Sequence, residues 1–231
     1  MLEKTRRAQR RQDTSNEIKA VARRHMQTQG AGALSLRAIA AEMQMTAPAI
    51  YRYFQNRDAL ITALIVDAFS ALAQALEAAR AAHSSASPVQ RLLAVLLAYR
   101  AWAVEHPTDF QLIYGTPIPG YEAPRDVTVP AVVRGFSVIV GLIDEVLQIV
   151  QPPAPYNTLP PALRAQFEAL IARDGYPISV LAFYLGVIGW TQLHGIIMLE
   201  LFGHLPPVVG DSEGFYHAQV VNMMRTMGIE P

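Results

Sequence analysis

Residues 35–54, SLRAIAAEMQMTAPAIYRYF, decide the fold of this chain, because they predict two short helices joined by a tight turn. Ser35 is placed to cap the first helix, since its hydroxyl can accept a hydrogen bond from a free N–H of the first turn. Thr46 is placed to cap the second helix in the same way. Pro48 falls in the first turn of that second helix, where a missing N–H costs little.

The two predicted helices have an apolar face and an outer face. The apolar face comprises Ile39, Ala40, Met43, Ile50 and Phe54. The second helix places the following side chains outward or along its flanks: Ala47, Ala49, Tyr51, Arg52 and Tyr53. Helices this short are not stable alone in water, so neighbouring elements must hold them. The pattern is typical of a helix-turn-helix, whose second helix enters a major groove of DNA, but a plain helical hairpin inside a bundle has the same spacing.

The charges of the chain are divided unevenly between its two parts. Residues 1–57 contain 11 Lys and Arg against 4 Asp and Glu, a net charge of +7. Residues 58–231 contain 8 basic against 15 acidic residues, a net charge of −7, so the overall charge of zero hides two opposite parts. A basic N-terminal quarter that carries a helix-turn-helix pattern indicates binding to the phosphates of a nucleic acid.

A longer motif begins in the second helix. Residues 51–60, YRYFQNRDAL, have the pattern Tyr-x-x-Phe-x-Asn-basic-acidic-x-Leu. With Ile39-Ala40 and residues 46–51, this motif resembles the DNA-binding domain of TetR-family transcriptional regulators. The resemblance extends over about residues 14–70.

Two positions depart from the family pattern. Gln44 occupies the turn position that is usually Gly, and it should adopt a left-handed conformation at some energetic cost. Arg57 replaces the usual Lys, which keeps the charge but not the geometry. Next to it, Asn56 is placed to cap a long fourth helix that continues to about Arg80.

The resemblance and the chemistry of the outer face together imply a set of DNA-binding residues. They are Arg37, Thr46, Ala47, Pro48, Ala49, Tyr51, Arg52, Tyr53 and Arg57. Arg37 is expected to form a forked hydrogen bond with guanine, although a lone surface arginine also commonly forms an ion pair. The first turn of the second helix is expected to contact base edges or thymine methyl groups, and Tyr51 a base or a phosphate. The remaining basic and tyrosine side chains are expected to contact phosphates.

A second resemblance lies in the C-terminal part. Its residues are 190–195 (WTQLHG), Leu199-Glu200, Gly203, Pro206, Glu105-His106-Pro107 and Tyr114-Gly115. They are similar to a subclass of TetR-like C-terminal domains marked by Trp, His and Gly. This resemblance implies a body with a ligand cavity, and a homodimer whose four-helix bundle is formed by helices at about 177–203 and 212–227. The apolar side chains of these helices must be covered by the body or by a twin subunit.

The rest of the chain also has helical patterns, with Pro and Gly clusters between them. The predicted helices are about 14–29, 56–80, 88–105, 107–114, 129–150, 160–173, 177–203 and 212–227. We found no pair of strands with a hairpin turn. The sequence therefore predicts an all-α fold of about nine to ten helices, in which a three-helix helix-turn-helix domain joins a larger helical domain for ligand binding and dimerisation.

Three regions follow from these patterns. Residues 1–13 form a basic arm without apolar periodicity, which is expected to be mobile and either to contact DNA or to act as a solubilising tail. Residues 14–57 form the DNA-binding domain, which extends to about residue 74 with the start of the connecting helix. Residues 58–231 form the ligand-binding and dimerisation domain.

Aromatic side chains on several body helices are candidates for an apolar ligand cavity. With a few polar or flexible neighbours, the candidates are Tyr99, Trp102, Phe110, Tyr114, Phe183, Tyr184, Trp190, His194 and Met198. A filled core uses the same residue types, so any one of them can simply be core. His194 lies in an apolar helix and must be hydrogen-bonded if it is buried.

Catalysis and metal binding have little support in the sequence. The chain has no cysteine, and we found no G-x-S-x-G, H-E-x-x-H or P-loop motif, so no catalytic residue and no cofactor are expected. Glu105, His106 and Asp109 are near one another in sequence, but Pro107 interrupts the helical geometry between them. No metal site is therefore expected.

One segment is long enough to cross a membrane. Residues 178–199 contain no Asp, Glu, Lys or Arg, but they include Thr191, Gln192 and His194 and lack basic flanks. A helix buried inside a protein has the same pattern. With a charged N-terminus and no cysteine, the sequence predicts a cytoplasmic protein without a membrane span.

The combined hypothesis is a ligand-responsive transcriptional regulator that binds a specific, palindromic DNA operator. The family resemblance implies a repressor that a small apolar effector releases from DNA. The alternative is an all-helical carrier or enzyme that uses the cavity itself and does not bind specific DNA.

Overall fold

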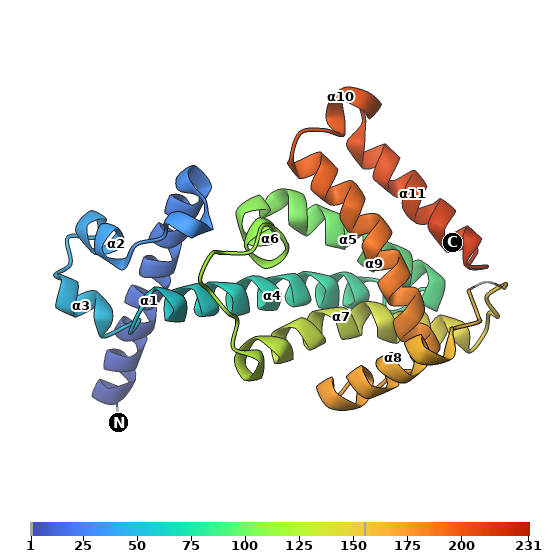
Figure 1. The fold of residues 1–231 in the computed structure, drawn as a ribbon, viewed down its shortest axis with the longest axis horizontal. Coiled ribbons are helices and arrows are strands. Elements are labelled where there is room, and N and C mark those ends of the chain that lie inside the picture. Colours follow the sequence, from blue (N-terminus) through green and yellow to red (C-terminus); the bar gives the residue numbers. More distant parts are fainter. Residues whose placement is uncertain (1, 155) are drawn as a thin grey trace. The chain divides into compact units, whose positions relative to one another are not determined.

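The computed structural model describes residues 2–154 and 156–231, and the regular secondary structure of this part of the chain is entirely helical (Figure 1). It contains eleven α-helices, the short 3-10 helix η1 (Ala31–Ala33) and no strand. The prediction of an all-α fold is confirmed. The helices divide into two compact units. Unit 1 comprises the residues up to Ala68 and Thr108–Thr128, and unit 2 comprises Phe69–Pro107 and Val129–Pro231.

Unit 1 is built around the predicted helix-turn-helix. Its helices are α1 (Leu2–Gln29), α2 (Leu36–Glu42), α3 (Ala47–Tyr51), the first half of α4 (Arg57–Ala82) and α6 (Pro107–Tyr114) from Thr108 onward. Its core includes Ile18, Val21, Ala22, Met26, Leu36, Ile39, Ala40, Ile50, Phe54, Leu60, Leu64 and Phe110. The sequence placed residues 108–128 in the body, whereas their contacts place them in this unit.

The turn and two of the three predicted caps have the expected geometry. The Ser35 hydroxyl accepts the Ala38 N–H, Asn56 accepts the Ala59 N–H at 2.8 Å, and Gln44 has a φ of 53° in the left-handed region. The predicted Thr46 cap is wrong, because its side chain forms no capping hydrogen bond. The reason is local: Pro48 has no N–H, and the Ala49 N–H already donates to the Thr46 carbonyl at 2.9 Å.

The predicted start of the first helix near residue 14 is wrong, because α1 begins at Leu2 and includes the basic residues of the predicted arm. Met1 lies outside the described residues. Arg, Gln and Ala dominate residues 6–12, and all three are good helix formers. Side-chain pairs four residues apart add to this: Gln9 donates to Asp13 at 2.9 Å, and Gln12 donates to Asn16 at 3.1 Å.

Unit 2 contains most of the body. Its helices are the second half of α4, α5 (Pro88–Glu105), α7 (Arg125–Leu147) from Val129 onward, α8 (Pro161–Asp174), α9 (Val180–Leu201), α10 (Pro206–Val209) and α11 (Ser212–Thr226). Within this unit α9 packs against α5, α8 and α11. Apart from the earlier start of α1, the predicted helices occur with ends shifted by a few residues, and the short α10 was not predicted.

Three helices are long and apolar enough to cross a membrane by length and composition: α4, α7 and α9. Each of them carries an ion pair to another helix. Asp67 of α4 pairs with Lys19, Arg134 of α7 with Glu77, and Glu200 of α9 with Arg100, each at 2.6 Å. Charged groups at such positions are costly in lipid, so the ion pairs favour core helices of a folded protein over membrane spans.

Candidate DNA-binding face and effector cavity

Helix α3 is held on its inner side and open on its outer side. Ile50 is fully buried and Phe54 is 7% exposed, while Tyr51 is 42% exposed. Of the nine predicted DNA-binding residues, six are exposed: Arg37, Thr46, Ala47, Pro48, Tyr51 and Arg52. Ala49, Tyr53 and Arg57 are half-buried. The core of unit 1 therefore presents the outer face of α3 to solvent.

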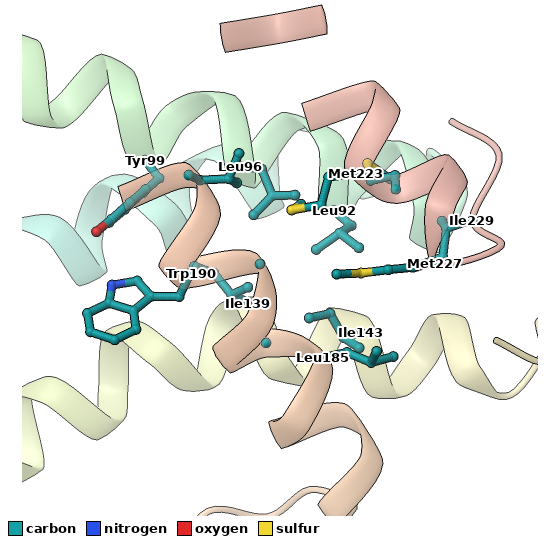
Figure 2. A pocket seen from close by; sticks show the side chains of 14 residues that line it. Leu92, Leu96, Tyr99, Ile139, Ile143, Leu185, Trp190, Met223, Met227 and Ile229 are labelled. Atoms are coloured by element: carbon teal, nitrogen blue, oxygen red, sulfur yellow. The ribbon is translucent and has the colours of Figure 1, made fainter. Parts of the chain in front are cut away.

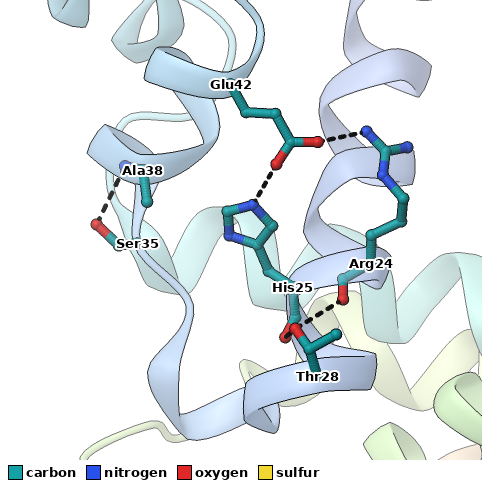
Figure 3. A network of polar contacts seen from close by, with 6 residues as sticks. All are labelled: Arg24, His25, Thr28, Ser35, Ala38 and Glu42. Atoms are coloured by element: carbon teal, nitrogen blue, oxygen red, sulfur yellow. Dashed lines mark hydrogen bonds and ion pairs between the residues drawn. The ribbon is translucent and has the colours of Figure 1, made fainter.

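A polar network fixes α2 against α1 (Figure 3). Glu42 of α2 accepts a hydrogen bond from the Arg24 guanidinium at 2.6 Å, and its other oxygen lies 2.6 Å from His25 Nε2. The Arg24 bond, helped by His25, lowers the pKa of Glu42, so this carboxylate stays ionised. The network thus sets the supporting helix, and with it the turn that leads into α3.

Arg57 differs from the other predicted phosphate contacts. Its guanidinium donates hydrogen bonds to the carbonyl oxygens of Leu34 at 3.2 Å, Ala31 at 3.3 Å and Gly32 at 2.9 Å. It therefore ties the start of α4 to the loop that precedes α2. Sequence reasoning assigned it to DNA only, because these carbonyls lie more than 20 residues away along the chain.

The arginines of unit 1 fall into two groups. Arg23 is paired with Asp109 at 2.8 Å, and Arg24 with Glu42. Within the described residues, the side chains of Arg37 and Arg52 form no ion pair. Their charges therefore repel the other positive charges of this unit and do not stabilise the fold. Their positive charge is available to an anionic partner.

Unit 2 contains a small apolar cavity between α5, α7, α9 and α11 (Figure 2). Its lining residues are Leu92, Leu96, Tyr99, Ile139, Ile143, Leu185, Gly186, Gly189, Trp190, Leu193, Met223, Met224, Met227 and Ile229. The cavity has a volume of about 30 Å³, which is close to the space that one water molecule occupies in the liquid. The side chains that line it are almost wholly apolar, and three of the lining residues are flexible methionines.

The polar neighbourhood of this cavity includes the predicted histidine. The Tyr99 hydroxyl lies 3.2 Å from His194 Nδ1, and the ring of Trp190 lies 5.3 Å from the His194 ring. Burial lowers the pKa of His194, so the ring is neutral at pH 7. Of the nine predicted ligand residues, Tyr99 and Trp190 line the cavity and His194 supports them.

The other six predicted ligand residues do not line this cavity. Phe183 and Tyr184 pack in an aromatic cluster with Phe167. Trp102 is buried against His106, and Met198 is half-buried elsewhere on α9. Phe110 and Tyr114 belong to unit 1. On a helix, positions three, four or seven apart share a face, so Leu185, Gly189 and Leu193 face the cavity together, as do Gly186 and Trp190. Phe183 and Tyr184 instead face Phe167 of α8.

Sequence reasoning missed most of the lining, including all three methionines. The sequence contains a signal for them: Met223, Met224 and Met227 share a face of α11, and Gly186 and Gly189 share a face of α9. The sequence analysis left it open whether the apolar side chains of these two helices are covered by the body or by a twin subunit. The missing Cβ at Gly189 leaves room for Met223, and the missing Cβ at Gly186 leaves room for Val140.

The two cavity glycines are expected to respond in opposite ways to alanine. At Gly189 an added Cβ would lie 3.4 Å from the flexible Met223 Sδ, so Gly189→Ala should raise the free energy of unfolding by up to about 1 kcal/mol through helix propensity. At Gly186 it would lie 2.5 Å from Val140 Cγ1, so Gly186→Ala should lower it by about 1–2 kcal/mol through overpacking. Urea unfolding measures both, and equal shifts would contradict this packing.

The weak metal cluster of the sequence is not assembled. The Asp109 carboxylate accepts two hydrogen bonds from Arg23, at 2.8 and 3.1 Å, and Asp109 lies in unit 1 whereas Glu105 and His106 lie in unit 2. Across residues 2–154 and 156–231, no group of three His, Cys, Asp or Glu side chains is close enough to hold a metal ion.

Comparisons with known proteins agree with this arrangement. The family described as "Bacterial regulatory proteins, tetR family" matches residues 18–64, and the family described as "Tetracyclin repressor-like, C-terminal domain" matches residues 92–223. The HTH-type transcriptional regulators Rv1816 of Mycobacterium tuberculosis and Mb1846 of Mycobacterium bovis are each 33% identical over 198 residues. That alignment covers 84% of this chain and 85% of theirs.

Solved structures give the same result. The protein SCO4313 superposes with a TM-score of 0.77 at 35% identity, over 94% of this chain and 98% of that one. The TetR family transcriptional regulator PfmR from Thermus thermophilus shares the fold, with a TM-score of 0.56 at 13% identity, over 90% of this chain and 97% of its own.

A helix-turn-helix unit joined to a helical body with a cavity is the architecture of a DNA-binding regulator. The chain belongs to the TetR family of transcriptional regulators. Members of this family are soluble, bind DNA and act as dimers. The relatives therefore point to a regulator rather than to an enzyme.

Proposed function

We propose that this protein is a repressor that binds a palindromic operator and leaves it when a small apolar effector binds the body. The observation that carries the proposal is the open face of α3, next to the unpaired Arg37 and Arg52, on a core that folds without them. Exposed arginines beside a recognition helix are typical of a protein surface that binds the phosphates and bases of DNA. A cytoplasmic location, with access to the genome, follows from the same proposal.

The reading residues divide into two classes. Arg37 is positioned for bidentate hydrogen bonds with guanine, and Thr46 to Ala49 for base edges and thymine methyl groups. Arg52 and Tyr53 are positioned for phosphates, which set register without reading sequence. The two helix-turn-helix units of a dimer would bind half-sites about 34 Å apart, or a multiple of that distance.

Arg37→Ala is expected to reduce affinity for the selected operator by about 5- to 150-fold while changing affinity for random DNA little, because a lost guanine contact costs about 1–3 kcal/mol. The operator is first selected from genomic fragments, and binding is then measured by fluorescence anisotropy. Arg164→Ala removes an exposed arginine from α8 in unit 2 and is the matched control. Equal losses on operator and random DNA would show that Arg37 does not read sequence, and no selectivity by the unaltered protein would refute the proposed function.

The dimer of this proposal uses α9 and α11. Within the described residues, the apolar side chains of α11 that the sequence left uncovered, including Val220 and Met224, are buried in the same subunit. Exposed apolar groups instead lie on α9 and α10: Trp190, Leu199, Phe202 and Val208, which is 81% exposed. Gly195, on α9, has open space around it, so a partner helix could approach closely there.

The effector in this proposal is uncharged and apolar, because the cavity walls offer almost nothing else. The free volume of about 30 Å³ is roughly a tenth of what a typical ligand site holds, so the proposal requires the cavity to open when an effector binds. Methionine side chains rearrange at low cost, and three of them line the wall. A ligand that binds only the opened body would shift the population away from the DNA-binding form.

The coupling is tested by titrating apolar compounds against the operator complex. A compound that binds the body should lower operator affinity, and operator DNA should lower affinity for the compound by the same factor. A compound that occupies the cavity without changing operator affinity would refute effector-driven release, while leaving DNA binding intact.

A further inference from the structure

The N-terminal part of α1 and the end of α3 enclose a basic groove. It is lined by Arg7, Arg10, Arg11, Thr14, Arg52 and Tyr53, all of which belong to unit 1. We call these six residues the arginine groove. Nothing in the helix-turn-helix itself requires it, because the core of unit 1 is complete from Ile18 onward.

The groove continues the packed face of α1. Arg7, Arg10, Arg11 and Thr14 are spaced at i, i+3, i+4 and i+7, which places them on one side of the helix. Further along the same stripe the side chains become apolar and buried, beginning with Ile18. The same helix face thus packs against the core in its C-terminal half and presents arginines in its N-terminal half.

The arginines of the groove are not used by the fold. Among the residues whose side chains the structure describes, 6–154 and 156–231, Arg7 and Arg10 form no hydrogen bond or ion pair, and Arg11 donates to the Arg52 carbonyl oxygen at 3.4 Å. Asp13, which lies three residues from Arg10, is bound by Gln9 at 2.9 Å. By contrast, arginines of unit 2 such as Arg100 and Arg134 are paired with carboxylates.

Three guanidinium groups held together without counter-charge repel one another and favour a multivalent anion. Arg52 and Tyr53, which follow the end of α3, form the opposite wall. A phosphate backbone bound in the groove would therefore be continuous with the DNA that α3 would read. Guanidinium groups pair bidentately with phosphate oxygens. The chemistry therefore fits a sugar–phosphate backbone.

We infer that the arginine groove binds the DNA backbone just outside each half-site, and that this extends the operator beyond the bases read by α3. The inference rests on the proposed function. The contact of the arginine groove with DNA should not depend on the flanking base sequence, because the phosphates are the same at every base pair. The inference also assigns residues 6–14 a function that requires the helical form of this segment.

The test compares two duplexes. One is the selected operator cut at the outer ends of its half-sites, and the other has about six more base pairs on each side. The added ~20 Å of DNA on each side exceeds the ~13 Å length of residues 6–14 in the helix. We expect the unaltered protein to bind the longer duplex at least fivefold more tightly at 0.1 M salt. The double variant Arg7→Gln, Arg10→Gln should bind both duplexes equally.

The salt dependence gives a second readout. On the longer duplex the slope of log K against log salt should weaken by about 0.9 for each phosphate contact that the double variant loses. Arg164→Gln, an equally exposed arginine in unit 2, is the control and should change neither the gain nor the slope. Thermal unfolding checks that the double variant retains its fold.

Three results would overturn the inference. One is equal binding of both duplexes by the unaltered protein, with operator selectivity intact. Another is the same gain in the double variant. The third is a gain that appears only with A·T-rich flanks and disappears with a minor-groove drug, which would mean minor-groove readout rather than phosphate binding. Absence of any operator selectivity would instead refute the proposed function, and the inference with it.

Discussion

Glu200→Gln is expected to lower the free energy of unfolding by about 3 kcal/mol, because removing one partner of a buried ion pair leaves the other charge uncompensated. The Glu200 carboxylate accepts hydrogen bonds from Arg100 at 2.6 and 2.8 Å, and both side chains are only 12% exposed. The pair joins α5 to α9. The Arg100 guanidinium also lies 5.9 Å from the centre of the Tyr216 ring on α11.

This site has a buried third member, so the loss should not stay local. The Tyr216 hydroxyl donates to the Leu96 carbonyl oxygen at 2.9 Å, and the residue is 1% exposed. Burial raises the pKa of Tyr216, so the hydroxyl keeps its proton and remains a donor at any ordinary pH. An uncompensated Arg100 would disturb the contact between α5, α9 and α11, which also form walls of the cavity.

Urea unfolding followed by circular dichroism measures the effect. The matched control is Glu77→Gln, which removes the carboxylate from a pair with Arg134 of nearly identical geometry, at 2.6 and 2.8 Å. The two side chains of that pair are 42% and 43% exposed, so loss of the ion pair should cost less than about 1 kcal/mol of the free energy of unfolding. Similar losses in the two variants would show that burial does not determine the strength of these pairs.

Gly195→Phe is expected to convert the dimer into monomers and to weaken operator binding about 100-fold or more, because two linked heads bind far more tightly than one. Gly195 lies on the exposed face of α9, and no atom comes within 4 Å of a Cβ placed there. The subunit itself therefore tolerates a larger side chain. A phenylalanine would, however, hold a partner helix away from Leu199, the exposed apolar residue one turn further along α9.

Light scattering after size-exclusion chromatography gives the oligomeric state, and anisotropy gives the operator affinity. The control is Gly141→Phe on α7, where an added Cβ also meets no atom within 4 Å. It should leave both the dimer and the affinity unchanged. A dimeric Gly195→Phe protein with full affinity would place the interface elsewhere, and dissociation of both variants would show that the substitution itself, rather than its position, is responsible.

The helix-turn-helix could be predicted from sequence because the residues that specify its caps and turn are close together in the chain. Ser35 and Asn56 cap helices that begin within three residues of them, and Gln44 accepts its left-handed conformation inside a four-residue turn. Thr46 shows the limit of such reasoning. Its cap failed because Pro48 removed one N–H and the backbone used the other, a competition that a list of favoured residues does not resolve.

The cavity could be predicted in kind but not in its residues. Aromatic content identified Tyr99 and Trp190, yet the walls are mainly Leu, Ile and Met from four helices. Which apolar residues meet depends on the rotation of each helix about its axis, and this rotation is set by the packing of all the others. The Tyr99–His194 contact joins residues 95 positions apart, and no local pattern specifies it.

The sequence by itself determined the helices, their order, the split of charge between the two parts, and the motif that marks the reading head. These properties depend on residues within a few positions of one another. Only the tertiary structure decided which charges are neutralised. Arg23, 86 positions from Asp109, is paired, whereas Arg7 and Arg10, on the same helix, form no ion pair among the residues whose side chains the structure describes. The physical reason is that a guanidinium group is chemically the same everywhere in the chain, and the fold alone places a partner beside it or leaves it for a ligand.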